Sequence, residues 1–107
     1  MPRGSILVVD DEAEIREGLE ELLSSENFEV SVAETGEAGL RKLEEHPFDL
    51  MLLDVSLPDR NGIDLLREIR GRDPHLAIIL ITAFGSRHGA RRVQERGAGL
   101  HHEAVVE

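Results

Sequence analysis

The chain has 107 residues, of which 40% are hydrophobic, so it has room for a single globular domain with one core. It contains no cysteine, which excludes disulfides and thiolate metal sites and favours a reducing, cytoplasmic location. The net charge of −10 argues against direct contact with nucleic acid, and no apolar run is long enough to span a membrane.

Strand and helix patterns alternate from the start of the chain. The apolar run 6–9 predicts a buried strand, and a helix with apolar residues on one face and glutamates on the others follows it. The apolar positions of this helix are Ile15, Leu19, Leu22 and Leu23. Residues 28–32 alternate as a half-exposed strand, and a second helix begins at the Thr-Gly pair 35–36 and stops at the His-Pro pair 46–47.

The same alternation continues in the second half. The apolar run 50–53 predicts another buried strand, and a turn cluster at 58–62 leads into a third helix that ends near Gly71. The run 76–81, which ends at Thr82, predicts the next strand. Alternating units of this kind predict an α/β fold with a parallel sheet, helices on both faces and right-handed crossovers.

Acidic residues stand where two of these strands end. Asp10 and Asp11 follow the first strand, and Asp54 ends the third. The carboxyl ends of parallel strands share one edge of the sheet, where open α/β folds place their sites. Clustered carboxylates repel one another and favour a hard divalent cation, so we expect Mg²⁺ there.

At that edge, Asp54 is placed to act as a nucleophile that forms an acyl phosphate. Asp10 and Asp11 would hold Mg²⁺ against it, and the backbone carbonyl of Ser56 would add a further oxygen. Thr82, at the end of the next strand, would offer its hydroxyl to a phosphoryl oxygen. Each of these residues alone is more often a helix cap or a turn residue, but their order and spacing together favour a site.

Four segments resemble the receiver domain of two-component response regulators. They are Val8-Val9-Asp10-Asp11-Glu12, Leu52-Leu53-Asp54-Val55-Ser56-Leu57-Pro58-Asp59, Asn61-Gly62 and Ile81-Thr82-Ala83-Phe84-Gly85-Ser86. The similarity covers residues 5–86. The last segment is most similar to receivers that precede enhancer-dependent, NtrC-type transcription activators.

The resemblance implies a flavodoxin-like, CheY-like doubly wound sheet with strand order 2-1-3-4-5. It implies that Asp54 is the phosphoacceptor, that Asp10, Asp11, Asp54 and the Ser56 carbonyl bind Mg²⁺, and that Thr82 is the switch hydroxyl. The implied phosphodonor is the phosphohistidine of a sensor histidine kinase. The implied output is a change of partner or a homodimer through the fourth helix and fifth strand, without turnover of an external substrate.

The segment from about residue 87 departs from the family's pattern. In the family a lysine ends the fifth strand and an aromatic switch residue lies three positions before it, and the corresponding positions here are Ala104 and His101. Lys42 is the only lysine in the chain, and it belongs to the second predicted helix. We therefore expect a degenerate fifth strand without the usual last helix.

The charge balance changes at the same point. Residues 1–86 carry 8 basic and 19 acidic groups, whereas residues 87–107 carry 4 basic and 3 acidic groups. The codons that can encode the steps from Gly99 to Val105 can also be read one nucleotide downstream. In that frame they permit, in order, Asp, Tyr, Ile, Thr, Lys and Pro, which is the ending expected of the family's fifth strand. We hypothesise that residues 1–107 form one receiver domain whose tail is out of frame, which the coding DNA would test.

Three other functions fit parts of the sequence. A phosphorylation-independent pseudo-receiver, which is a pure interaction module, agrees with the missing lysine. A Mg²⁺-dependent phosphohydrolase would need a second aspartate where Ser56 stands, and a flavodoxin would need a phosphate cradle where residues 10–12 repel phosphate. No output domain fits into 107 residues, so we expect a single-domain regulator or, from the resemblance to multidomain activators, a fragment.

Overall fold

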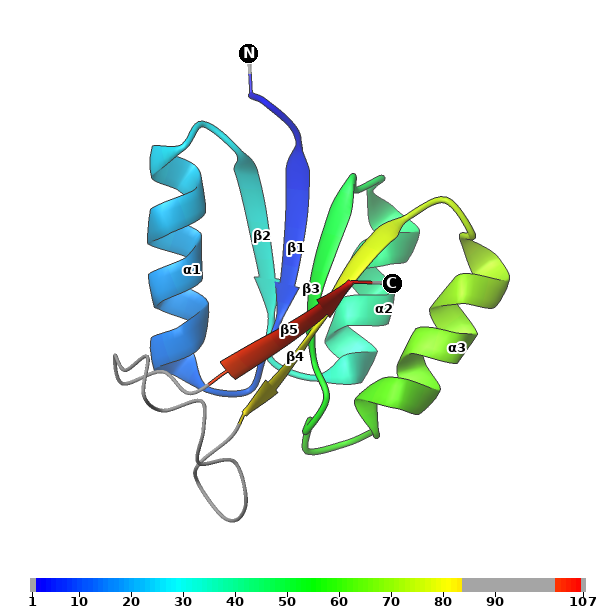
Figure 1. Cartoon of the computed structure of the whole chain (residues 1–107). Helices are drawn as coiled ribbons and strands as arrows, with labels where there is room; N and C mark the ends of the chain where they lie inside the picture. The colour runs from blue at the N-terminus through cyan, green and yellow to red at the C-terminus, as the bar shows by residue number, and fades with distance from the viewer. Residues whose placement is uncertain (1, 84–101, 107) are drawn as a thin grey trace.

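The computed structural model describes residues 2–83 and 102–106 as a five-stranded sheet with three helices (Figure 1). The elements are β1 (Ser5–Val9), α1 (Ala13–Ser25), β2 (Glu29–Ala33), α2 (Gly36–Glu45), β3 (Leu50–Asp54), α3 (Gly62–Arg72), β4 (Ala77–Ala83) and β5 (His102–Val106). One face of the sheet carries α1, and the other carries α2 and α3 (Figure 1). None of the described helices has the length and apolarity needed to cross a membrane.

The strand order is β2-β1-β3-β4-β5, which confirms the predicted order. The first four strands pair in parallel. The fifth differs from the expected all-parallel sheet, because β5 runs antiparallel to β4 with His102 opposite Ala83. Its direction follows from where it starts: β5 begins at the edge of the sheet where β4 ends, whereas a parallel strand would need a crossover to the opposite edge.

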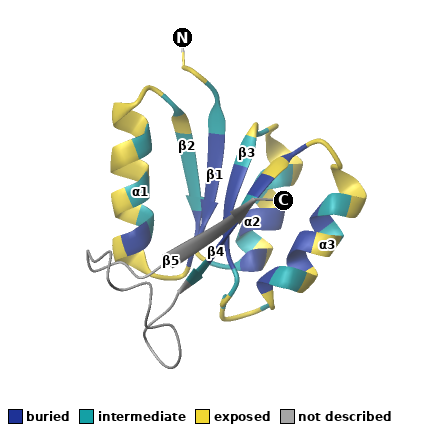
Figure 2. Cartoon of the chain, in the orientation of Figure 1, coloured by how far each residue is buried: buried dark blue, intermediate teal, exposed yellow. Residues whose placement is uncertain are grey.

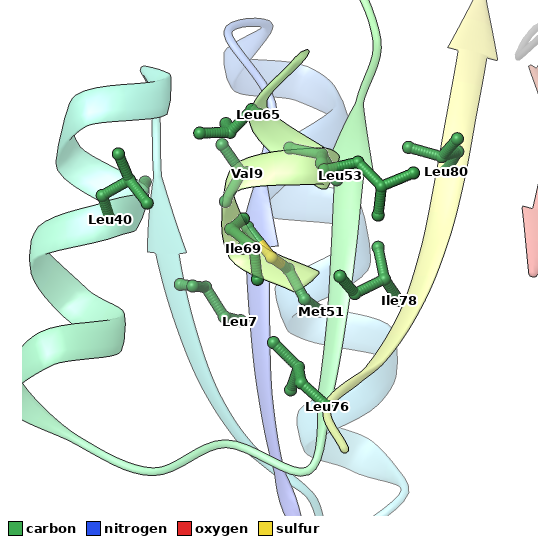
Figure 3. Close-up of a cluster of buried hydrophobic side chains, with 12 residues drawn as sticks. Leu7, Val9, Leu40, Met51, Leu53, Leu65, Ile69, Leu76, Ile78 and Leu80 are labelled. Carbon is green, nitrogen blue, oxygen red and sulfur yellow. The ribbon is translucent and has the colours of Figure 1, made fainter. Parts of the chain in front are cut away.

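β1 and β3 read as continuous apolar runs because both of their faces are covered, whereas β2 is only partly buried (Figure 2). Alternate residues of each strand point to opposite faces, so two clusters form. The cluster under α2 and α3 contains Leu7, Val9, Ala33, Leu40, Met51, Leu53, Leu65, Leu66, Ile69, Leu76, Ile78 and Leu80 (Figure 3). The smaller cluster under α1 contains Ile6, Val8, Leu52 and Ile81.

Capping side chains explain where α2 and α3 begin. The Oγ1 atom of Thr35 accepts a hydrogen bond from the N–H of Ala38 at 3.0 Å, and the Oδ1 atom of Asn61 accepts one from the N–H of Ile63 at 2.8 Å. The first amides of a helix have no acceptor within the helix, so each cap stabilises it by about 1 kcal/mol. α2 stops at Glu45, before the His-Pro pair, as predicted.

One apolar residue of the predicted helical stripe lies on the surface. Leu22 of α1 is 57% exposed, whereas Ile15 is buried and Leu19 and Leu23 pack against the smaller cluster. α1 lies over β1 and β2 as the single described helix on its face (Figure 1), and its apolar stripe meets the sheet through Leu19 and Leu23. Leu22 lies at the margin of that stripe and faces solvent.

Two helical glycines provide a matched test of packing against the sheet. A Cβ atom at Gly39 of α2 would lie 2.9 Å from Cγ2 of the buried Val9, whereas a Cβ atom at Gly18 of α1 would have nothing within 4 Å. We expect Gly18→Ala to raise the free energy of unfolding by about 0.5–1 kcal/mol, because alanine is the better helix former. We expect Gly39→Ala to lower it by about 1–3 kcal/mol through overpacking, as measured by urea denaturation. Equal stabilisation by both changes would contradict the close contact between α2 and β1.

Candidate functional site

Three carboxylates converge where β1 and β3 end. Val9 pairs with Leu53 in the parallel ladder, so the residues that follow them, Asp10 and Asp54, lie side by side. Asp11 adds a third carboxylate, and one oxygen from each of the three lies within 4.8 Å of the others. Asp10 is 1% exposed and Asp54 is 5% exposed, whereas Asp11 is open to solvent. The fold therefore brings together the three acidic residues that the sequence singles out.

Hydrogen bonds from the following loops orient the two buried carboxylates. The Oδ1 atom of Asp10 accepts from the N–H of Glu12 at 2.9 Å, and the Oδ1 atom of Asp54 accepts from the N–H of Ser56 at 3.0 Å. The Oδ2 atom of Asp10 is buried and has no hydrogen-bond partner in the described part of the chain. An unpaired buried oxygen costs free energy, so this atom is an acceptor available to an added ligand.

The surroundings of Asp10 disfavour its ionised form. Burial raises the pKa of the Asp10 carboxyl above its usual value, and the neighbouring charges of Glu12 and Asp11 raise it further. The N–H of Glu12 and the guanidinium of Arg16 act in the opposite direction. A cation bound among the carboxylates would favour the ionised form of each of them.

The donor set fits a hard divalent cation. It consists of carboxylate oxygens alone, and one of these oxygens is buried without a partner among the described residues. Two like charges about 4 Å apart repel by roughly 4 kcal/mol at an effective dielectric of 20, and a divalent cation between them removes this repulsion. Mg²⁺ is commonly held by one or two carboxylates together with water, so the residues present fit this ion.

The loop between β3 and α3 is closed at its base. Ser56 and Asn61 form an isolated antiparallel bridge, and the N–H of Gly62 donates to the carbonyl of Val55 at 2.9 Å. A Cβ atom at Gly62 would lie 2.5 Å from the Cα of Val55, so only glycine allows the two backbones to approach this closely. The loop thereby fixes the backbone of Ser56, two residues after Asp54.

Thr82 lies beside the end of β3. Asp54 pairs with Ile81 of β4, and the N–H of Val55 donates to the carbonyl of Ile81 at 3.0 Å. Thr82 is the next residue along β4, and its buried Oγ1 atom has no hydrogen-bond partner among the described residues. The strand pairing thus places a hydroxyl with unused hydrogen-bonding capacity at the edge where the carboxylates converge.

The two family positions in the tail stay predictions. Ala104 has its backbone in β5 opposite Ile81, and His101 lies outside the described residues. Lys42 lies in the last turn of α2. Because α2 starts at the edge with the carboxylates and runs away from it (Figure 1), the only lysine in the chain is remote from them.

Arg16 makes a contact with the acidic loop that sequence reasoning missed. Its guanidinium donates to the backbone carbonyl of Asp10 at 2.8 Å. Helical periodicity marks Arg16 only as a polar position on α1, and the contact depends on how α1 packs against the loop before it. Arg16 therefore ties the start of α1 to the acidic loop and brings positive charge close to Asp10.

A comparison with protein-family models decides the family. The model described as the response regulator receiver domain matches residues 6–101, which is most of the chain. The chain belongs to this family. The match continues past residue 86, where the quoted motifs end, into the segment that departs from the family's usual strand ending.

The receiver is similar to parts of longer regulators. The response regulator protein PilR of Pseudomonas aeruginosa is 39% identical over 98 residues, which are 92% of this chain and 22% of that protein. The transcriptional regulatory protein CpxR of Klebsiella pneumoniae is 47% identical over 81 residues, which are 76% of this chain and 34% of that protein. The receiver thus spans 22% and 34% of the lengths of these curated relatives.

Solved structures confirm the CheY-like fold. The response regulator protein TrrA of Thermotoga maritima, in complex with Mg²⁺-BeF, is 42% identical with a TM-score of 0.73, covering 79% of this chain and 72% of that chain. A CheY-like receiver domain protein of Methanospirillum hungatei is 36% identical with a TM-score of 0.73, covering 77% and 66%. Receiver domains bind Mg²⁺ at an acidic pocket, and the group of Asp10, Asp11 and Asp54 matches such a pocket.

The raised pKa of Asp10 predicts how the stability of the metal-free receiver depends on pH. Between the unfolded value of 3.8 and the higher folded value, the folded chain binds more protons than the unfolded one, so stability falls as the pH rises through this window. Asp10→Asn removes this fall and keeps an acceptor for the N–H of Glu12. We expect the variant to be more stable than the wild type at neutral pH, and each kcal/mol gained would raise the melting temperature by roughly 4–8 °C in a domain of this size.

Thermal melts of the two proteins from acidic to neutral pH, without divalent cations, measure this difference. A variant that is less stable than the wild type at neutral pH would contradict the repulsive environment of Asp10.

Proposed function

We propose that this receiver accepts a phosphoryl group on Asp54 from the phosphohistidine of a sensor histidine kinase, in a Mg²⁺-dependent reaction in the cytoplasm. The observation that carries the proposal is the convergence of Asp10, Asp11 and Asp54, with two of the three buried at the end of adjacent strands. Receivers of response regulators are phosphorylated by histidine kinases and act in regulation rather than substrate turnover. The relatives named as transcription regulators support a transcriptional output.

The chemistry needs little more than a positioned nucleophile. A carboxylate oxygen of Asp54 attacks the phosphorus, a new O–P bond forms, and the N–P bond to the imidazole breaks with its electron pair going to nitrogen. The N–H of Ser56 holds the Asp54 carboxylate in place at the end of β3 by donating to its Oδ1 atom. When bound, Mg²⁺ would offset the negative charge that the phosphoryl oxygens bring to the site.

The chain's own oxygens would hold this ion. We assign Asp10, Asp11, Asp54 and the backbone carbonyl of Ser56 as its ligands. The assignment is supported by the all-oxygen donor set and by the Oδ2 atom of Asp10, which no described residue hydrogen-bonds. Thr82 would donate its hydroxyl hydrogen to a phosphoryl oxygen on Asp54, and it would thereby move the end of β4. Homodimerisation through the fourth helix and fifth strand and an output domain in a longer protein belong to the same proposal.

A second candidate, the phosphorylation-independent pseudo-receiver, is favoured by one observation. The only lysine in the chain is Lys42, which lies at the far end of α2, so no lysine is available to pair with a phosphoryl group on Asp54. In that case the fold would act as an interaction module without a covalent switch.

Intact-mass spectrometry distinguishes the two candidates. Incubation with Mg²⁺ and acetyl phosphate is expected to add a single phosphoryl group to the wild type and none to Asp54→Asn, because the amide is a poor nucleophile. Chelation of the metal is expected to abolish the adduct as well. A wild type that folds, as shown by circular dichroism, and yet gains no phosphoryl group would support the pseudo-receiver.

The switch role of Thr82 makes a separate prediction. Thr82→Val replaces the hydroxyl by a methyl group of similar size, and the hydroxyl has no partner among the described residues, so the unphosphorylated variant should be as stable as the wild type or up to about 1 kcal/mol more stable. It should still form the Asp54 adduct, but lose the phosphorylation-dependent shifts of the amide resonances at 81–83. If phosphorylation shifts these resonances in the variant as much as in the wild type, Thr82 has no role in the switch.

A further inference from the structure

The loop that follows Asp54 reaches across to α2 through Asp59. The Oδ1 atom of Asp59 accepts from the N–H of Gly36 at 2.9 Å, and its Oδ2 atom accepts from the N–H of Glu37 at 3.0 Å. These are the first two amides of α2, which have no acceptor within the helix. In the sequence, Asp59 has the appearance of an ordinary turn residue, so this contact emerges only from the fold.

The contact goes beyond what α2 needs for its own cap. Thr35 already accepts from the third amide of the helix, at Ala38, as a local N-cap does. Asp59 adds a two-point attachment from a segment more than twenty residues further along the chain. The N–H groups of Gly36 and Glu37 hold the pKa of the Asp59 carboxyl below its usual value, so the attachment is charged at neutral pH.

The neighbouring residue makes a second attachment in the same place. The guanidinium of Arg60 donates to Glu37 of α2 at 3.1 Å and also pairs with Glu68 of α3. A Cβ atom at Gly36 would lie 3.3 Å from both Asp59 and Arg60, so the loop and the helix start are in close contact. The tip of the loop is therefore held by α2, while its base is closed by the bridge between residues 56 and 61.

Ser56 stands at the base of this loop, where it pairs with Asn61. Its backbone carbonyl is a proposed metal ligand, and the loop has five residues between Ser56 and Gly62 that set where this carbonyl lies. Releasing the tip of the loop would leave Ser56 held at the base alone, whereas Asp54 would stay in β3 and Asp10 directly after β1. We propose that Asp59 is a positioning residue for the metal site, which binds the N-terminus of α2 and thereby fixes the loop that carries the Ser56 carbonyl.

This role rests on the proposed function, because it requires the metal site. It also has a reciprocal consequence, since two linked equilibria change each other by the same factor. If the attachment to α2 favours metal binding, then metal binding strengthens the attachment to α2. The first turn of α2 therefore responds to the ion, although no residue of α2 belongs to the proposed ligand set.

A titration of the unphosphorylated full chain with Mg²⁺ alone tests this coupling. Binding is monitored through the amide resonances of the chain. We expect Asp59→Ala to weaken Mg²⁺ binding by about tenfold, as loss of an outer supporting contact does at metal sites. Asp59→Asn keeps one acceptor oxygen and should give an intermediate loss. Asp64→Ala is the matched control. It removes an exposed carboxylate of α3 that lies 4.0 Å from the guanidinium of Arg67, and its Mg²⁺ affinity should stay within about twofold of wild type.

Amide hydrogen exchange separates positioning from a purely structural role. In the wild type, Mg²⁺ should slow the exchange of the amides at 36 and 37 by the same factor of about ten, and in Asp59→Ala it should not. If Asp59→Ala binds Mg²⁺ with wild-type affinity and shows wild-type hydrogen exchange, this inference is overturned but the proposed metal site is not. The same holds if Asp64→Ala loses as much Mg²⁺ affinity as Asp59→Ala. A wild type that binds no Mg²⁺ would overturn both the inference and the proposed metal site. If Asp59→Ala fails to fold, Asp59→Asn decides by the same readouts.

Discussion

Three like charges within 4.8 Å of one another, two of them buried, are the constraint on which the rest of this receiver depends. The parallel pairing of β1 with β3 imposes it, because the register sets the residues after Val9 and Leu53 beside each other. Burial and repulsion disfavour the charged state, as the raised pKa of Asp10 shows. The apolar clusters on both faces of the sheet offset this cost, so the carboxylates stay together without a cation, and a cation finds them already assembled.

The segments around the carboxylates restrict how that electrostatic strain is relieved. The N–H of Ser56 holds Asp54, the backbone contact at Gly62 closes the following loop, and Arg16 holds the carbonyl of Asp10. The ends of β1 and β3 are fixed in this way. A change in charge among the carboxylates is therefore expected to move the elements that border them more easily than these two strands. The bordering elements are the end of β4, where the Thr82 hydroxyl has no partner among the described residues, and the start of α2.

The parallel core could be predicted because its signals are local. The runs 6–9 and 50–53 are unbroken apolar segments with acids directly after them, and the sheet topology then forces those acids together. The direction of β5 could not be predicted, since it depends on the edge at which the chain re-enters the sheet, which hydrophobic periodicity does not encode. The contacts of Arg16 and Asp59 were missed for a related reason: each joins a polar side chain to backbone groups whose position is set by tertiary packing.

The attachment of Asp59 to α2 also bears on the order in which the chain folds. Thr35 caps α2 locally, but both acceptors for its first two amides belong to Asp59, which lies beyond β3 and is 23 positions from Gly36 and 22 from Glu37. Loop-closure entropy must be overcome before such contacts contribute. The first turn of α2 therefore gains its full protection only when β3 and the loop beyond it have docked, which makes the N-terminal end of this helix a late-consolidating part of an otherwise locally specified fold.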